Sequence, residues 1–130
     1  MRLHHYGLAT KSVDRSLKEF EKLGYTRVSN NIVDPVQGVE LLFIDNNAGH
    51  LIELVSPVSD RSPVNRILEK VGLSIYHICY EVEDLDNVIA EFKSKRFIKV
   101  MKPTPATAFG NKRICFLYNA LTGLIELLER

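Results

Sequence analysis

An internal repeat is the feature that most constrains this chain. Shifted by 72 residues, the sequence places His5 on His77, Asp14 on Asp86 and Phe20 on Phe92 without a gap. Towards the end of each copy the offset becomes 73, and residues 51–55 (LIELV) fall on residues 124–128 (LIELL). Repeats of this length mean that one supersecondary unit occurs twice, and that the copies bury a surface neither could cover alone. The sequence therefore predicts two equivalent modules.

Each copy reads as a strand, a helix and three further strands. The first copy has its expected strands at residues 2–9, 25–33, 39–45 and 51–56. Its helix is capped by Ser12 and ended by Gly24. The second copy has its expected strands at residues 75–82, 97–102, 113–118 and 124–129, with a helix at residues 85–95 that begins after Asp84. The pattern predicts an α+β fold made of two βαβββ modules.

Two segments lie outside this scheme. Residues 57–73 form a connector between the modules, with a short helix that starts at Ser62 and Pro63. Residues 103–112 contain two prolines, so we expect a loop outside any sheet, of a length typical of loops that cover a site. At 130 residues the chain is expected to be one domain, with module 1 at about residues 1–56 and module 2 at about residues 74–130.

Charge and cysteine content exclude several classes of function. Seventeen Lys and Arg against sixteen Asp and Glu give a net charge of +1, which argues against nucleic acid or an acidic membrane as a partner. Cys79 and Cys115 lie in apolar strands without the spacing of a disulfide framework, so we interpret them as reduced core thiols. The first residues do not resemble a signal peptide, and we expect a cytoplasmic protein.

The repeat brings four chemically distinctive residues into equivalent positions. His5 and His77 lie in the first strand of each copy, and Glu53 and Glu126 lie in the last. Each glutamate stands in the middle of an apolar strand, where a carboxylate loses its hydrating water. Burying an unpaired charge costs roughly several kcal/mol of folding free energy. The strands that carry Glu53 and Glu126 contain no lysine or arginine. Two imidazoles and two carboxylates that hold one divalent metal would satisfy both charges.

Taken singly, each of these residues has an ordinary explanation. A lone strand histidine is usually a core or surface residue, and a lone glutamate usually faces solvent. The joint occurrence at equivalent positions is what favours the metal. His4 and His50 have no counterpart in the other copy, so we expect both on the surface.

The chain resembles the vicinal oxygen chelate superfamily over essentially its whole length. The resembling segments are residues 5–9, 16–25, 51–54, 76–82 and 123–127. The resemblance implies paired βαβββ modules whose curled, mostly antiparallel sheet surrounds an open cleft with a metal at its base. His5, Glu53, His77 and Glu126 match the family's ligand positions. The metal would be zinc, nickel, cobalt or manganese, and family relatives are usually homodimers.

Glyoxalase I and methylmalonyl-CoA epimerase are the patterns within the superfamily that the sequence is most similar to. The resemblance implies a metal-dependent lyase or isomerase that moves a proton next to a carbonyl, through an enediolate or enolate stabilised by the metal. The implied substrates are a thiol hemithioacetal, an acyl-CoA or another 2-oxo or thioester compound. Glu126 is the first candidate for the group that carries the proton, and Glu53 is the second.

One position departs from the epimerase pattern. Residues 34–39 resemble the epimerase Gln-Gly-Val segment, but Leu41 stands where that pattern has a second catalytic acid. Glu40 is adjacent, and strand alternation should turn its side chain to the other face. The alternative function is a metal-free binding or resistance protein that sequesters a small molecule in the same cleft. Such a protein has no need of His and Glu at all four positions.

Overall fold

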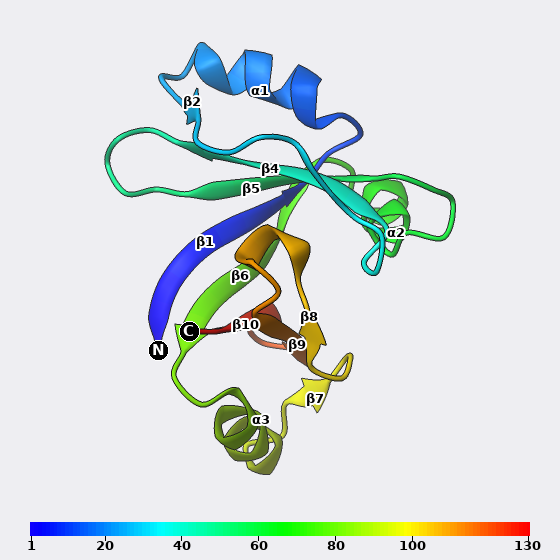
Figure 1. Cartoon of the computed structure of the whole chain (residues 1–130). Helices are drawn as coiled ribbons and strands as arrows, with labels where there is room; N and C mark the ends of the chain where they lie inside the picture. The colour runs from blue at the N-terminus through cyan, green and yellow to red at the C-terminus, as the bar shows by residue number, and fades with distance from the viewer. The chain divides into compact units, whose positions relative to one another are not determined.

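The computed structural model describes all residues 1–130, which form two compact units. The N-terminal unit contains His5–Tyr76, and the C-terminal unit contains His77–Arg130 together with Met1–His4. In each unit a helix covers the strands, and the order of elements in Figure 1 repeats twice. The expected α+β class and the two βαβββ modules are confirmed.

The N-terminal unit is built on β1 (Arg2–Ala9), whose first residues belong to the other unit. Its other elements are α1 (Val13–Glu21), β2 (Thr26–Arg27), β3 (Ile32–Asp34), β4 (Val39–Asp45), β5 (Ile52–Pro57) and α2 (Val64–Lys70). The strand order is β2-β4-β5-β1, and β3 pairs with β4. The β1–β5 pair is parallel and the others are antiparallel.

One face of this sheet is covered by α1. Val13 and Leu17 of the helix pack against Leu42 of β4 and Leu54 of β5, and these four side chains are buried. The helix begins where the sequence predicts, because the Ser12 hydroxyl accepts a hydrogen bond from the Arg15 amide at 3.3 Å. Figure 1 shows α1 lying over β4 and β5. Strand alternation leaves the opposite face of the same strands free of this helix.

The C-terminal unit repeats the arrangement. Its elements are β6 (Ser74–Val82), α3 (Leu85–Ser94), β7 (Ile98–Lys99), β8 (Thr104–Pro105), the 3-10 helix η1 (Thr107–Phe109), β9 (Arg113–Asn119) and β10 (Gly123–Glu129). The order is β6-β10-β9-β7, with β6 and β10 parallel and β8 paired with β9. The Asp84 carboxylate caps α3, which packs Leu85 and Ile89 against Leu117 and Leu127.

Two of the expected strands are shorter than the sequence predicts. The strand expected at residues 25–33 is broken into β2 and β3, and the strand expected at residues 97–102 is only β7. The break has a local cause, because the Ser29 hydroxyl accepts a hydrogen bond from the Phe43 amide at 2.8 Å, in place of a backbone carbonyl. Side-chain hydrogen bonds of this kind compete with regular pairing and are hard to see in a β-rich pattern.

The expectation that residues 103–112 lie outside the sheet is wrong in part. Thr104 and Pro105 form β8, which pairs with Ile114 and Arg113 of β9 at the edge of the sheet. Proline is tolerated there because an edge strand has one side without ladder hydrogen bonds. The next residue, Ala106, is fully buried. This segment therefore packs against the sheet of its own unit.

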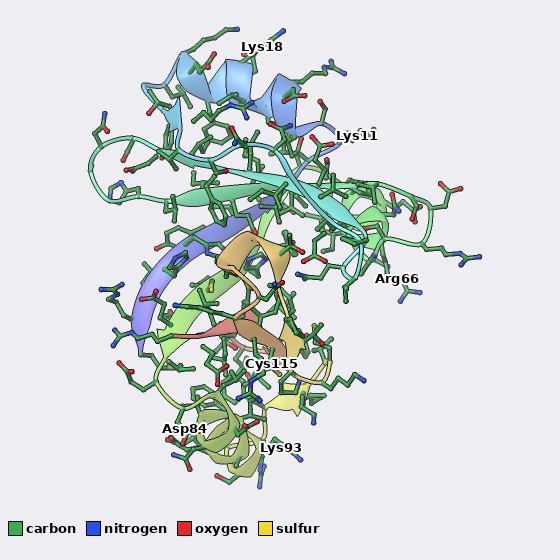
Figure 2. The ribbon with its side chains drawn as sticks, in the orientation of Figure 1. Lys11, Lys18, Arg66, Asp84, Lys93 and Cys115 are labelled. Carbon is green, nitrogen blue, oxygen red and sulfur yellow. The ribbon has the colours of Figure 1, made fainter.

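The two cysteines lie in the core, as the sequence predicts. Neither cysteine forms a disulfide and both are buried, and burial raises the pKa of the Cys115 thiol. Figure 2 shows Cys115 inside the C-terminal unit, whereas Lys18 and Lys93 project outward from α1 and α3. None of the helices combines the length and the apolar character that a membrane span needs.

Candidate functional site

His5 and Glu53 form a buried pair in the N-terminal unit. The His5 Nε2 atom lies 3.3 Å from Glu53 Oε2, and the two residues are 1% and 5% exposed. Glu53 lies beside Gly7 of β1 on one side and beside Phe43 of β4 on the other. The Phe43 ring meets the His5 ring edge-on, with centroids 5.4 Å apart. The pair is thus enclosed by an aromatic ring and by apolar strands.

His77 and Glu126 form the equivalent pair in the C-terminal unit. His77 Nε2 lies 3.1 Å from Glu126 Oε2, and these residues are 2% and 3% exposed. Glu126 lies between Cys79 of β6 and Phe116 of β9. The Phe116 ring meets the His77 ring edge-on, again with centroids 5.4 Å apart. The same arrangement is therefore built twice, from the three long strands of each module.

The sequence forces these side chains to the face that is not covered by a helix. In β5, Ile52 and Leu54 pack towards α1, so Glu53 between them must point the other way. In β10, Ile125 and Leu127 pack towards α3 and Glu126 points away in the same manner. Each carboxylate then has a histidine from the parallel neighbouring strand at close range.

The chemistry and spacing of each pair fit two ligands of one metal ion. Charge-assisted N–H···O⁻ hydrogen bonds have typical lengths of about 2.7–2.9 Å, which is shorter than either pair shows. Two ligand atoms bound to the same zinc ion at about 2.0–2.2 Å would lie about 2.8–3.6 Å apart in tetrahedral or octahedral geometry. The observed 3.1 Å and 3.3 Å fall within that interval. Neutral imidazole and carboxylate are also the donor types that zinc, nickel, cobalt and manganese accept.

The two pairs differ in one neighbour, which the sequence analysis did not connect with the site. Gly7 stands beside Glu53, whereas Cys79 stands beside Glu126. The Cys79 side chain is fully buried and packs with Ala106, Ile114 and Leu128. The two phenylalanines were also missed, although the repeat aligns Phe43 with Phe116 and so carried the signal. They supply the ring that shields each histidine.

The structure confirms the prediction that the Glu40 side chain points away from the face on which Leu41 lies. Its carboxylate accepts a hydrogen bond from Asn31 Nδ2 at 2.6 Å, and the same Asn31 amide donates to Asp14 of α1 at 3.1 Å. Glu40 therefore faces the helix side of the sheet. Leu41 is 2% exposed and lies on the opposite face, which it shares with Glu53. No carboxylate of residues 39–41 lies on that face.

The other histidines divide. His50 is exposed, as expected, and lies 3.3 Å from Asn46 Nδ2. The expectation that His4 is a surface residue is wrong, because it is half-buried and its ring stacks edge-on against Phe109 at 5.6 Å. The sequence could not show this contact, which joins the N-terminus to the 3-10 helix of the second module. Phe109 therefore packs against His4 within the C-terminal unit.

Arg113 is held by two acids of the C-terminal unit. It donates hydrogen bonds to Glu129 at 2.6 Å and 2.9 Å and to Asp86 at 3.1 Å. The hydrogen bond from Arg113 holds the pKa of Glu129 below its ordinary value. The guanidinium thus ties α3 to the sheet.

Paired βαβββ modules, each with a buried histidine and glutamate, define the class as a chelate-type fold. The chain belongs to the Glyoxalase/Bleomycin resistance protein/Dioxygenase superfamily, whose profile matches residues 4–116. This is the vicinal oxygen chelate superfamily that the sequence resembles.

Curated relatives and solved structures of similar chains include several epimerases. Methylmalonyl-CoA epimerase of Dictyostelium discoideum is 28% identical, over 99% of this chain and 78% of the relative. The crystal structure of methylmalonyl-CoA epimerase from Mycobacterium tuberculosis is 27% identical, with a TM-score of 0.85 over 98% of this chain and 87% of that one. A Streptomyces coelicolor methylmalonyl-CoA epimerase in complex with 2-nitronate-propionyl-CoA shares the fold, with 23% identity and a TM-score of 0.85 over 99% of this chain and 96% of that one. These relatives indicate an enzyme of the isomerase class.

Proposed function

We propose that this chain is a metal-dependent isomerase of the epimerase kind, which moves the proton on the carbon next to the thioester carbonyl of an acyl-CoA. The observation that carries the proposal is the buried His–Glu pair that occurs once in each module. Burial of two carboxylates is costly unless a cation or hydrogen bonds compensate their charge. The epimerase relatives supply the substrate class.

We infer that His5, Glu53, His77 and Glu126 together hold one divalent ion. All four are buried and all four are ligand types for zinc, nickel, cobalt or manganese. When bound, the metal would act as a Lewis acid towards the carbonyl oxygen of the substrate. The phenylalanine ring beside each histidine limits the access of water to the pair.

We assign the proton transfer to Glu126 first and to Glu53 second. A carboxylate within hydrogen-bond reach of the substrate carbon can act as the general base or acid. Glu126 lies beside Cys79 and Phe116, and its carboxylate is 3.1 Å from His77 Nε2. Glu53 has the equivalent place beside Gly7, which has no side chain.

The leucine at position 41 shapes this assignment. Inversion of a carbon centre needs a proton removed on one side and returned on the other. The Leu41 side chain can neither remove nor return a proton, and Glu40 faces α1. We therefore assign the proton transfer on the second side of the carbon to Glu53. A site arranged in this way should exchange the proton with solvent faster than it inverts the centre if Glu53 is poorly placed.

The test is a paired assay on the metal-loaded chain in deuterated water. Methylmalonyl-CoA is followed for deuterium at C2 by mass spectrometry and for inversion by a stereospecific coupled enzyme, and a methylglyoxal hemithioacetal is assayed in parallel. We expect metal-dependent exchange on the thioester. Turnover of the hemithioacetal alone would instead identify a glyoxalase-type lyase. If either compound binds in the absence of metal and its proton does not exchange, the result would support the alternative function, a metal-free binding protein.

Three expectations from the sequence stay predictions. They are the single-domain organisation over residues 1–130, the homodimer and the cytoplasmic location. Light scattering on the purified chain measures the oligomeric state, and a mass of twice 14.8 kDa is the expected result. A monomer with full activity would place the complete site within one chain.

A further inference from the structure

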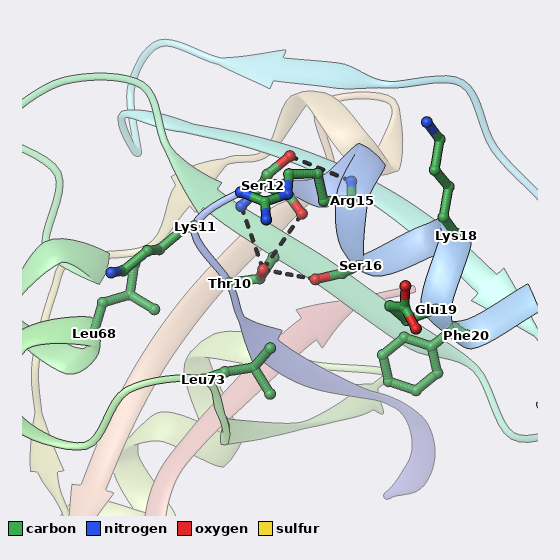
Figure 3. A pocket seen from close by; sticks show the side chains of 10 residues that line it. All are labelled: Thr10, Lys11, Ser12, Arg15, Ser16, Lys18, Glu19, Phe20, Leu68 and Leu73. Carbon is green, nitrogen blue, oxygen red and sulfur yellow. Dashed lines mark hydrogen bonds between the residues drawn. The ribbon is translucent and has the colours of Figure 1, made fainter.

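A groove on the N-terminal unit has a lining that the proposed function does not use. It runs between the first two turns of α1, Thr10 at the end of β1, and the apolar side chains of Leu68 and Leu73 (Figure 3). Its volume of about 570 Å³ falls in the roughly 300–1,000 Å³ range of small-molecule sites. The groove lies on the α1 side of the sheet, whereas His5 and Glu53 lie on the opposite face.

The lining of the groove has more basic than acidic side chains. Lys11, Arg15 and Lys18 line it and form no ion pair. The one acid in the lining, Glu19, is neutralised by Lys22 at 2.7 Å. Asp14, the other acid near the start of α1, faces away and lies 3.7 Å from Arg27. Positive charge is therefore left over in the groove itself, and the complementary occupant is an anion.

The base of the groove is already organised. The Thr10 and Ser16 hydroxyls, both buried, are hydrogen-bonded to each other at 2.7 Å. The Ser12 hydroxyl caps α1 by accepting from the Arg15 amide. These hydroxyls are satisfied within the protein, so the recognition of a charged group rests on the Arg15 guanidinium and the Lys11 ammonium. In Figure 3, Arg15 lies over Ser12, Lys11 extends towards Leu68, and Lys18 points away from both.

The opposite wall is apolar. Leu68 and Leu73 face the α1 wall, on which Phe20 adds an aromatic ring. Leu73 is 61% exposed although it is a large aliphatic side chain. An anion with an apolar body would cover this surface, at a gain of about 25 cal/mol per Å² of apolar area removed from water. A purely polar anion such as phosphate would leave it in contact with water.

We propose that this groove binds a small amphiphilic anion, with its carboxylate or phosphate held by Arg15 and Lys11 and its apolar part against Leu68 and Leu73. Guanidinium groups pair with such anions through two parallel hydrogen bonds, and the ammonium adds a second charge. The site is separate from the His–Glu pairs, so its occupancy can be measured whether or not the isomerase proposal is correct.

The test uses octanoate as the probe and amide chemical shifts of the ¹⁵N-labelled full chain as the readout. Octanoate should shift the amides of residues 10–20, 68 and 73 to saturation. Octanol, which lacks the charge, and phosphate, which lacks the apolar part, should each bind at least about tenfold more weakly. Octanol or phosphate that binds as tightly as octanoate, or octanoate that leaves these amides unmoved, overturns the proposal.

Variants locate the anion. Arg15→Gln and Lys11→Gln remove exposed charges, so the fold should persist, and each should weaken octanoate by about tenfold. Lys93→Gln on α3 is the matched control, because it removes the same charge from an exposed helix position of the other unit and should leave binding unchanged. Equal weakening by Lys93→Gln would show attraction by net charge alone and would contradict a specific site.

Discussion

Removal of the metal should lower the melting temperature of this protein by about 10 °C. The four proposed ligands come from β1, β5, β6 and β10, at positions 5, 53, 77 and 126, so the unfolded chain does not hold them together. A ligand that binds only the folded state at 100 times its dissociation constant stabilises it by about 2.7 kcal/mol. Unfolding entropy of about 2.1 cal/mol/K per residue gives roughly 0.27 kcal/mol/K for 130 residues. The quotient is the expected shift of about 10 °C.

Differential scanning calorimetry measures this shift directly. The chain is first stripped with a chelator, and zinc, nickel, cobalt or manganese is then restored at 100 times the dissociation constant found by titration calorimetry. Glu53→Gln and Glu126→Gln should each lose most of the shift, because an amide is a weaker ligand than a carboxylate. His50→Gln is the control, since His50 is an exposed imidazole outside the pairs. It should retain the full shift.

Either of two results would contradict a metal site at these four residues. One is a melting temperature that none of the four metals changes. The other is a shift of equal size in the parent and in both glutamine variants, which would place the metal elsewhere on the chain.

Three further predictions follow from the site and its surroundings. Glu126→Gln should keep the fold but slow deuterium exchange on the substrate by about 10²–10⁴-fold, and exchange at the parental rate would remove Glu126 as the base. Leu41→Glu should raise inversion relative to exchange on methylmalonyl-CoA, because it restores an acid on the face of Glu53; an unchanged ratio would show that this position does not meet the substrate. Arg113→Gln should destabilise the chain above about pH 4.3, the ordinary Glu pKa, because Arg113 lowers the pKa of Glu129 in the folded state. The difference from the parent should fade as the pH drops through that lowered pKa, and urea unfolding at pH 7 and pH 3 compares the two.

The repeat explains why so much of the fold was visible in the sequence. Helix starts depended on single capping residues, Ser12 and Asp84, and both caps form as predicted. The long strands depended on apolar alternation and were correct to within about two residues. The same alternation placed Glu40 on the helix side and Leu41 on the side of Glu53, which the Asn31 contact confirms.

The errors arose where a local hydrogen bond or a tertiary contact replaces periodicity. Ser29 interrupts an expected strand through its hydroxyl, and Pro105 joins a sheet because it stands at an edge. The half-buried His4 depends on Phe109, more than a hundred residues away in the sequence. Cys79 was interpreted only as a core thiol, since its place beside Glu126 depends on strand register. Such contacts leave no periodic trace in a single sequence.

Anomalous diffraction tests the central claim, that two His–Glu pairs share one divalent ion, most directly. Crystals grown with zinc or nickel are measured at the absorption edge of the metal. The account predicts one strong peak per chain, bonded to His5, Glu53, His77 and Glu126. A peak at any other set of residues, or no peak at these four while the metal is in excess, would contradict it.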